Sequence, residues 1–487
     1  MNAPTIPTVY ELSVAGRHGI DLPECDVPKA PLPVSGLRND CDLPELSQVD
    51  VVRHYLALSQ RNFGVDTGFY PLGSCTMKFN PKINEQVARL PGFVNTHPLQ
   101  DPVSVQGNLA LMFALQNWLA EIGGFAAVSL QPSAGAHGEL TGLLMMRAYH
   151  RARGDDRRTR ILIPDSAHGT NPASTTMAGL TAVELPSDAR GNVDLEAVRA
   201  ACDETVAGLM ITNPNTLGLF EEHIEEVVRI VHGCGGLVYG DGANMNALAG
   251  IARPGDLGFD VMHFNLHKTF ATPHGGGGPG SGPVGVSAPL KDFLPGPLVE
   301  RVRHDEGERH VLAMPPQSIG RVSTFFGNFG MFVRAYAYIR QHGAAGLRAN
   351  SEHAVLNANY LRVKLRDVFN VPFDRVCMHE FVCEGAIEGT GVRALDVSKR
   401  LLDYGFHPPT NYFPLIVPEA LMIEPTETEA RPTLDAFAAA MRMIAAEARS
   451  DPAKVKGAPY DTPVRRLDEV KAARELVLRD RTKSAGA

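Results

Sequence analysis

A lysine in the stretch HFNLHKTFATPHGGGG, residues 263–278, is the residue of this chain best suited to covalent chemistry. Lys268 follows the apolar run DVMHFN, which predicts a strand that places the lysine just beyond a strand end. A lysine amine held away from water is shifted toward its neutral, nucleophilic form, which attack on a carbonyl carbon requires. A surface lysine beside a glycine linker is the alternative, and it is the default for any lysine taken alone.

A carboxylate, Asp241, ends another apolar run within VYGDGANMNA. A carboxylate buried at a strand end is costly unless a partner compensates its charge. A ligand with a protonated ring nitrogen would be such a partner, and the carboxylate would hold that proton by raising the pKa of the nitrogen. A helix N-cap and a metal ligand are the alternatives, and the metal is the weaker one because no second carboxylate lies near in sequence.

Two further stretches add a flat ring and an anion site. His168 lies in a Gly/Asn-rich turn after the predicted strand Arg160–Asp165, where an imidazole could stack on an aromatic ligand; bonding within its own loop explains it equally well. In QPSAGAHGEL, residues 131–140, small residues precede a long predicted helix, whose first N–H groups favour an anion. An ordinary helix cap also explains that stretch, and no GK[ST] follows it as in a P-loop.

The four features together fit one ligand better than any of them does alone. An anion site, a stacking ring, a carboxylate and an amine match the phosphate, the aromatic ring, the pyridine nitrogen and the aldehyde of pyridoxal phosphate. Asp241 and Lys268 are 27 residues apart (268 − 241), which leaves room for one intervening strand. Neighbouring strand ends would then bring both groups to the same ligand.

Short apolar runs alternate with helical segments from about residue 102 to 290, as in RILIPD, VAGLMITN and GLVYGD. This alternation predicts βαβ units and therefore an α/β domain with a mostly parallel sheet covered on both faces. Ligands of such sheets bind beyond the C-terminal ends of the strands. The predicted elements therefore place the candidate residues where a ligand would lie.

Four regions are predicted along the chain. Proline-rich residues 1–100 form an extended arm with one clear helix at 48–62, and residues 101–345 form the large α/β domain. Residues 346–450 form a smaller α+β domain, and 451–487 form a charged tail. The arm and a loop-rich stretch at 300–317 are expected to contact another subunit, because neither buries much apolar surface by itself.

Composition excludes several classes of protein. The formal net charge is −8 and no dense Lys/Arg cluster occurs, so nucleic acid is not expected as a partner. No apolar run approaches the ~18 residues of a membrane span, and no secretory signal is expected in the first 20 residues. The seven cysteines form no CxxC pair, which disfavours a zinc ribbon and fits a reducing, cytoplasmic location.

The stretch HFNLHKTFATPHGGGGPGSGPVGV resembles the pyridoxal-lysine segment of the glycine cleavage system P-protein family, the decarboxylating glycine dehydrogenases. YPLGSCTMKFNP at 70–81, ITNPNTLGLFE at 211–221, GDGANMNA at 240–247 and QPSAGAHGEL resemble the same family. The resemblance runs from about residue 50 to beyond 420. The family exists as one long chain with two related halves or as two subunits, and this chain resembles the lysine-bearing half, subunit 2.

The resemblance implies the fold of the aspartate-aminotransferase-like, pyridoxal-phosphate-dependent transferases, fold type I. It also implies that Lys268 holds pyridoxal 5′-phosphate covalently, that Asp241 pairs with the ring nitrogen, and that His168 stacks on the ring. These three are the expected catalytic residues, and no metal site is expected. The further cofactor contacts that the resemblance implies are Ala243 on the opposite ring face, Gly135 and Ala136 at the phosphate, His267 beside it, and Asn213 and Thr216 near the cofactor or substrate.

The implied activity is decarboxylation of glycine with transfer of the remaining aminomethyl group to the lipoyl group of H-protein. The implied partners are subunit 1 of the P-protein, with two copies of each subunit, and lipoylated H-protein. Nothing in the residues alone indicates the lipoyl acceptor.

Two other functions stay open from the sequence. A group II amino-acid decarboxylase would share the segment Asn265–Lys268 and would release an amine instead of transferring it. A non-catalytic structural subunit is the second alternative, and the presence of Lys268, His168 and Asp241 argues against it. Cys75 could be a nucleophile or a redox switch, but a small buried apolar residue is the simpler interpretation without a neighbouring base.

Overall fold

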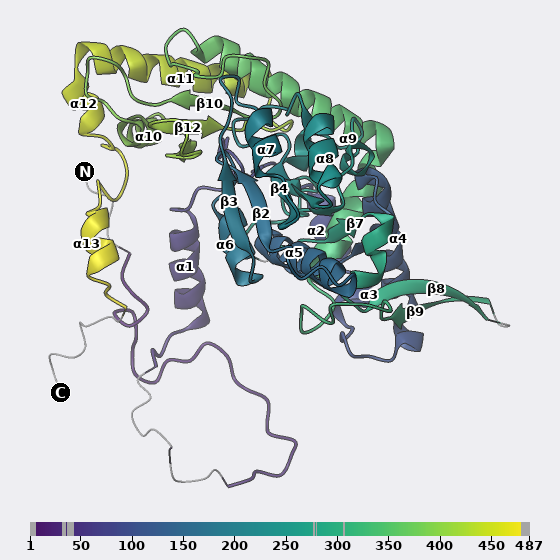
Figure 1. Cartoon of the computed structure of the whole chain (residues 1–487). Coiled ribbons are helices and arrows are strands. Elements are labelled where there is room, and N and C mark those ends of the chain that lie inside the picture. The colour runs from purple at the N-terminus through teal and green to yellow at the C-terminus, as the bar shows by residue number, and fades with distance from the viewer. Residues whose placement is uncertain are drawn as a thin grey trace. The chain divides into compact units, whose positions relative to one another are not determined.

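The computed structural model describes residues 6–31, 36, 43–275, 278, 280–304 and 307–478 (Figure 1). Its contacts divide the chain into two units, which are Met1–Gly68 with Pro459–Ala487, and Phe69–Ala458. No helix among the described residues combines the length and the apolar composition of a membrane-crossing helix. The four predicted domain boundaries stay predictions.

The first unit holds the predicted helix of the arm. Helix α1 (Gln48–Ser59) ends three residues before the predicted end at Asn62. Ser47 caps it, because its hydroxyl accepts from the Asp50 N–H and the Asp50 carboxylate accepts from the Ser47 N–H. No residue of α1 is buried, so the helix depends on its cap and local bonds. The tail of the chain adds the short helix α13 (Glu469–Arg474).

A seven-stranded sheet forms the centre of the second unit. Its strands in spatial order are β1 (Ala127–Ser129), β7 (Val284–Val286), β6 (Val261–His263), β5 (Leu237–Asp241), β4 (Val206–Thr212), β2 (Arg160–Pro164) and β3 (Thr181–Leu185). Strands β3, β2, β4, β5 and β6 are parallel, and β7 runs antiparallel to both β6 and β1. The predicted mostly parallel sheet is confirmed. Because β5 and β6 are neighbours, the residues that follow them reach the same edge of the sheet.

The central strands are mostly apolar because helices cover both faces of the sheet. All seven residues of β4 are buried. Its side chains enter two different cores: Ala207 and Met210 belong to the core that includes α5 (Gly135–Ala152), and Leu209 and Ile211 belong to the core that includes α8 (Ile224–Gly233). The other helices of this region are α2 (Lys82–Ala88), α3 (Pro91–Val94), α4 (Gln106–Gly123), α6 (Thr170–Met177) and α7 (Leu195–Ala201), with short 3-10 helices η1 (Pro102–Val105), η2 (Gly242–Ala247), η3 (Pro254–Leu257) and η4 (Ala288–Phe293).

A second core lies toward the C-terminus, around an antiparallel sheet of β10 (Phe381–Glu384), β12 (Ala420–Ile423) and β11 (Thr410–Asn411). Figure 1 shows this sheet beside α9 (Phe329–Leu365) and α11 (Arg431–Ser450). Helices α10 (Ala394–Asp403) and α12 (Pro452–Lys456) complete the region. The predicted mixture of helices and strands is present here, and α9 consists of two helical parts that meet at Gly343, where the backbone leaves helical geometry with a φ of 60°.

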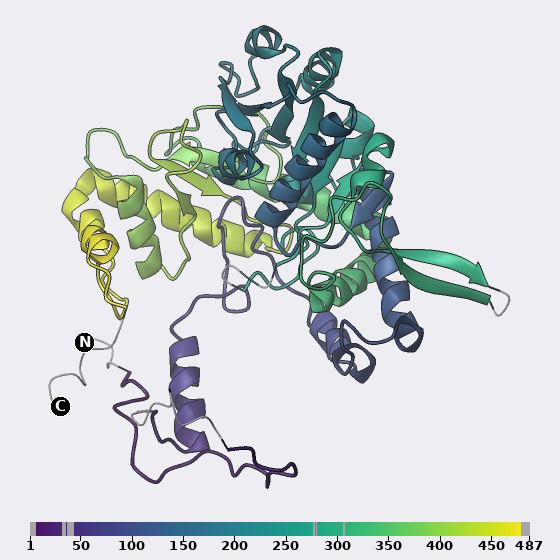
Figure 2. The ribbon, with the colours of Figure 1, turned by 60° about the horizontal axis from the view of Figure 1, so that its bottom comes forward.

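The loop-rich interpretation of residues 300–317 is wrong for most of that stretch. Strands β8 (Leu298–His304) and β9 (Gly307–Ala313) form an antiparallel hairpin, with Leu298 opposite Ala313. Figure 2 shows the hairpin projecting from the body of the second unit, as Figure 1 also does. Most of its side chains are charged or partly exposed, so the sequence lacks the apolar alternation that would have indicated strands.

We expect Gly208→Ala to lower the free energy of unfolding by about 1–3 kcal/mol, as overpacking does. An added methyl group in β4 would lie 2.2 Å from the Leu237 carbonyl oxygen and 2.4 Å from the Met146 methyl carbon. Gly233→Ala is the matched control, since nothing lies within 4 Å of its added methyl group in α8. Urea denaturation of both variants checks this, and equal midpoints would contradict the packing argument.

Candidate active site

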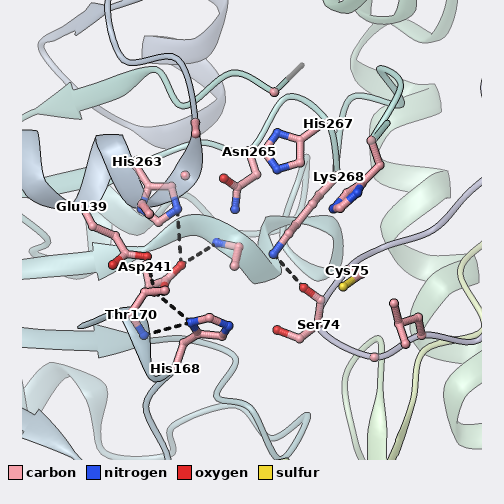
Figure 3. A pocket seen from close by; sticks show the side chains of 18 of the residues that line it. Ser74, Cys75, Glu139, His168, Thr170, Asp241, His263, Asn265, His267 and Lys268 are labelled. Carbon is pink, nitrogen blue, oxygen red and sulfur yellow. Dashed lines mark hydrogen bonds and ion pairs between the residues drawn. The ribbon is translucent and has the colours of Figure 1, made fainter. Parts of the chain in front are cut away.

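A cavity of about 620 Å³ opens at the C-terminal ends of β5 and β6. Its volume lies within the ~300–1,000 Å³ typical of small-molecule sites. Figure 3 shows side chains that follow these two strands pointing into it, together with groups from the loop before α6 and from the segment around Ser74. The predicted residues that line it are Gly135, Ala136, His168, Asp241, Ala243, His267 and Lys268.

Lys268 lies five residues beyond the end of β6, in the turn that follows it. Its main-chain N–H donates to the Asn265 carbonyl oxygen at 3.0 Å. Its amine donates to the Ser74 carbonyl oxygen at 2.6 Å, and Figure 3 shows the side chain crossing the cavity toward that segment. The predicted strand Asp260–Phe264, observed as β6, thus ends close to the lysine that it was expected to position.

Asp241 is the last residue of β5 and only 4% exposed. Its carboxylate accepts from the Ala243 N–H at 2.9 Å and from the Asn171 side-chain amide at 3.2 Å, and His263 Nε2 lies 3.4 Å away. Burial by itself raises the pKa of this carboxyl, but His263, the Ala243 N–H, Lys268 and Asn171 together lower it below its usual value. The buried carboxylate therefore keeps its negative charge.

His168 comes from the turn between β2 and α6. Its Nδ1 lies 2.8 Å from the Thr170 hydroxyl and accepts from the Thr170 N–H at 3.2 Å. Burial lowers its pKa, the Asp241 charge opposes this, and Lys268 adds to it. The result is a neutral, flat ring on the cavity wall, and Ala243 contributes a small apolar surface to the same cavity.

The anion site predicted at the start of α5 has the expected backbone. Ala134 precedes the helix in extended conformation, and no side chain caps the first N–H groups. Gly135 has to be glycine, because a Cβ there would lie 2.4 Å from the Asn265 side-chain oxygen. These N–H groups and the helix dipole together favour a negatively charged ligand.

His267 lines the cavity beside Gly278 and Gly280. Burial, with the nearby Lys268 and His274, lowers its pKa to about 3, and its Nδ1 accepts from the Ser281 N–H at 3.3 Å. The ring is therefore neutral, with Nε2 as its N–H donor. Of the glycines at 275–278, Gly276 and Gly277 lie outside the described residues.

Asn213 and Thr216 are not among the residues that line the cavity. The Asn213 side-chain oxygen accepts from the Glu221 N–H at 3.1 Å, and the Thr216 hydroxyl donates to the Ser166 carbonyl. Both residues lie in the loop after β4, behind the turn that carries His168. Their proposed place near the cofactor or substrate stays a prediction.

Sequence reasoning missed three groups at the cavity. Glu139 in α5 is a second buried carboxyl, which accepts from the Thr170 hydroxyl at 2.8 Å. His263 connects Asp241 to the Tyr239 hydroxyl, which lies 2.6 Å from its Nδ1. Ser74 comes from a segment almost 200 residues before its lysine partner. His263 could have been found as the last residue of the predicted strand, whereas the other two depend on long-range packing.

Cys75 also lines the cavity. Burial raises the pKa of its thiol, although Lys268 acts in the opposite direction. A thiol that stays protonated is a poor nucleophile. The site therefore argues against Cys75 as a nucleophile, and the structure places it as a half-buried side chain of the cavity wall.

Comparison with known proteins identifies relatives over nearly the whole chain. The chain is 59% identical over 477 residues to the probable glycine dehydrogenase (decarboxylating) subunit 2 of Caldanaerobacter subterraneus subsp. tengcongensis, covering 97% of this chain and 98% of that protein. It is 56% identical over 478 residues to the protein of the same description from Alkaliphilus oremlandii, covering 97% of each. A family model described as glycine dehydrogenase, C-terminal domain, matches residues 350–461.

Solved structures confirm the fold. A glycine decarboxylase (P-protein) of the glycine cleavage system, in inhibitor-bound form, matches with a TM-score of 0.73 at 22% identity, covering 85% of this chain and 93% of that one. Glutamate decarboxylase of Lactobacillus brevis matches with a TM-score of 0.64 at 16% identity, covering 90% and 97%. The predicted fold type I of pyridoxal-phosphate-dependent enzymes is confirmed.

Identity of this extent over almost the full length of both chains also confirms the resemblance drawn from the motifs. The chain belongs to the family of glycine dehydrogenase (decarboxylating) subunit 2.

Proposed function

We propose that this chain is the pyridoxal-phosphate-dependent subunit that decarboxylates glycine in the glycine cleavage system and passes the aminomethyl group to the lipoyl group of H-protein. Family membership supports the reaction, and the fold supports the cofactor. The observation that carries the proposal for this chain is the convergence of Lys268, Asp241 and the uncapped start of α5 on one cavity.

The residues of the cavity fit pyridoxal phosphate. When bound, this cofactor supplies a carbonyl group that reacts with amines and a conjugated pyridine ring that accepts the electron pair released with carbon dioxide. The start of α5 and His267 would receive the phosphate, and the ring would lie between His168 and Ala243. Asn265 supports this fit, because its side-chain oxygen is buried at the cavity without a hydrogen-bond partner.

Lys268 is the covalent attachment point in this proposal. Its amine reaches into the cavity, and no other lysine is among the described residues that line this cavity. Whenever the amine is not attached to the cofactor, the Ser74 carbonyl would hold it in the cavity, through the hydrogen bond of 2.6 Å. Lys268 can then accept or donate one proton at the reacting centre.

Asp241 holds a proton on the pyridine nitrogen. Its carboxylate stays charged in a buried position, and a negative charge beside that nitrogen raises the pKa of the nitrogen. His263 and Asn171 fix the orientation of the carboxylate through the contacts described above. A fixed charge in a site that excludes water stabilises the developing electron pair more than the same charge in water.

Transfer to H-protein needs a partner with a disulfide. Loss of carbon dioxide leaves an aminomethyl group, which bonds to one sulfur of the lipoyl disulfide as the sulfur–sulfur bond breaks. The other sulfur takes a proton, so the disulfide is reduced by two electrons: formally, one comes from the carboxyl carbon as it becomes carbon dioxide and one from the α-carbon as it bonds to sulfur. The description "subunit 2" of the relatives supports a partner subunit 1, and two copies of each subunit and a cytoplasmic location remain proposals.

Lys268→Ala should remove the visible absorbance of bound pyridoxal phosphate. The exchange of bicarbonate with the glycine carboxyl should fall at least about a thousandfold, because the variant has lost its nucleophile. Spectroscopy and isotope exchange, with subunit 1 and H-protein present, check this. Lys291→Ala, at an exposed lysine of η4, is the control and should match the wild type. Retention of both signals in Lys268→Ala would contradict the assignment.

Asp241→Asn should still bind the cofactor covalently, because the size of the side chain is kept. Its bicarbonate exchange should fall about a hundredfold or more, since the fixed negative charge beside the ring nitrogen is lost. The checks are the exchange rate and borohydride trapping of the cofactor on Lys268. Glu221→Gln neutralises a buried carboxylate away from the cavity and is the control. An unchanged exchange rate in Asp241→Asn would remove this role.

Free methylamine separates the proposal from a group II decarboxylase. The proposed transferase should turn over glycine only when lipoylated H-protein is present. Accumulation of free methylamine without H-protein, at a comparable rate, would favour the decarboxylase instead.

A further inference from the structure

The segment that meets Lys268 has an unusual backbone. Ser74 has a φ of 64° and Thr76 a φ of 46°, so two side-chain-bearing residues occupy the left-handed region. This conformation is unfavourable for such residues, and most of all for a β-branched one. Strained residues of this kind persist only where the surroundings hold them, and they are concentrated at functional sites.

Two buried glutamates hold this turn. The Ser74 N–H donates to Glu380 Oε2 at 2.7 Å, and the Thr76 N–H donates to Glu424 Oε2 at 2.8 Å. The Thr76 hydroxyl donates to the other oxygen of Glu424 at 2.6 Å. Each strained residue is therefore bound through its own main-chain N–H by a different carboxyl group.

The small sheet places the two glutamates side by side. Glu380 directly precedes β10 and Glu424 directly follows β12, and these strands pair with Phe381 opposite Ile423. The antiparallel register therefore brings positions 380 and 424 to the same end of the sheet. Both side chains are fully buried there. The antiparallel sheet thus reaches the wall of the cavity at the edge of the parallel sheet.

The turn contributes a hydrogen-bond acceptor to the cavity. Its Ser74 carbonyl oxygen accepts the hydrogen bond from the Lys268 amine at 2.6 Å. Ser74 is thereby bonded on both sides, by Glu380 at its N–H and by Lys268 at its carbonyl. A change in the backbone angles of Ser74 would turn that carbonyl away from the amine.

We propose that Glu380 and Glu424 are positioning residues, which hold the strained turn Ser74–Thr76 so that the Ser74 carbonyl receives the amine of Lys268. The role rests on the proposed function, because it serves the lysine in the interval when glycine has displaced it from the cofactor. The amine then stays beside the reacting carbon instead of moving freely in the cavity, and its return is fast.

The charge state of the pair fits this role. Burial raises the pKa of Glu380, with Glu424 adding to it, and burial raises the pKa of Glu424 to about 7. Two carboxyl groups this close favour sharing one proton, because two buried negative charges side by side repel each other. The charged groups that face the pair are Lys268 and Glu427. His379 lies in the same cluster, but burial and Lys268 lower its pKa to about 3, so its ring is neutral.

A metal ion is the alternative occupant of this cluster. His379 Nε2 lies 3.9 Å from Glu380 Oε1 and 3.8 Å from Glu424 Oε1, and neither ring nitrogen has a hydrogen-bond partner. Among the described residues, this is the group with spacing suitable for a metal. However, all four carboxyl oxygens already accept hydrogen bonds, three from the turn and one from the Asn244 side chain at 3.3 Å. The carboxyl groups therefore bind the turn and not a metal ion.

Hydrogen exchange in the cofactor-free protein tests directly whether Glu380 and Glu424 hold the turn Ser74–Thr76. Glu380→Leu and Glu424→Leu should speed amide exchange in the peptide that contains Ser74–Thr76 at least about tenfold, because each loses a hydrogen bond to a buried carboxyl. Glu380→Gln keeps an acceptor oxygen and should retain most of the protection. Glu221→Leu is the matched control, since Glu221 is a buried carboxyl that accepts from the Val193 and His223 N–H groups elsewhere.

The control separates local from global effects. Glu221→Leu should leave exchange in the 74–76 peptide unchanged. Faster exchange throughout the Glu380→Leu protein, including β5, would mean that the fold is lost. The Glu380→Gln variant then decides whether an acceptor at position 380 holds the turn. Slow exchange at 74–76 in both Leu variants would overturn the proposal. So would a stoichiometric metal ion in the purified protein whose chelation reproduces the fast exchange.

A glycine rescue tests the link to Lys268. Glu380→Leu should slow the uptake of added pyridoxal phosphate onto Lys268 and lower kcat, with little change in the KM for glycine. Adding Ser74→Gly should recover about fivefold of each loss, because glycine adopts a positive φ without strain while keeping the carbonyl. No recovery would overturn the strained-turn argument. If the wild type takes up no pyridoxal phosphate at all, the proposed function fails. The hydrogen-exchange result still decides whether Glu380 and Glu424 hold the turn.

Discussion

The negative charge of Asp241 at the end of a buried strand is the constraint on which the site depends. A carboxylate without water has to be compensated by donors and positive charge, or it takes up a proton. Here the compensation comes from the next strand through His263, from the first turn of α6 through Asn171, and from the N–H of Ala243 two residues on. The parallel order of β4, β5 and β6 makes these contacts possible, because it brings the residues that follow the strands to one edge.

The carboxyl groups near the cavity differ in pKa because their surroundings differ. Asp241 has donors on both oxygens and a pKa below its usual value. Glu139 is buried in the same wall, but burial and the charge of Asp241 raise its pKa above its usual value. Glu380 behaves in the same way beside Glu424. Asp241 is therefore the carboxyl group of the cavity whose pKa is lowered, and the remaining acids bind hydroxyl and main-chain N–H groups.

Sequence reasoning found the residues that follow strands and missed those held by long-range packing. The pattern of apolar runs predicted the parallel sheet, and the residues after three of its strands predicted His168, Asp241 and Lys268 as cavity residues. These predictions depend only on local periodicity and on the geometry of parallel sheets.

There are physical reasons why sequence reasoning missed these features. Glu139 and Asp241 are about a hundred residues apart, and Ser74 and Lys268 are farther apart still, so no spacing rule connects them. The hairpin β8–β9 is too polar to show apolar alternation. In each case, tertiary contacts decided a conformation that local pattern left open.

The segment around Ser74 explains why an irregular stretch can be specified so closely. Residues 70–81 form little regular structure, and on composition they belong to the proline-rich arm. They are fixed by buried partners instead: Glu380 and Glu424 bind the turn, and Lys78 forms an ion pair with Glu427 at 2.7 Å, both groups buried. A buried lysine paired in this way would be costly to expose or to leave alone. The segment therefore has one low-energy position, and in that position it completes the wall opposite the sheet.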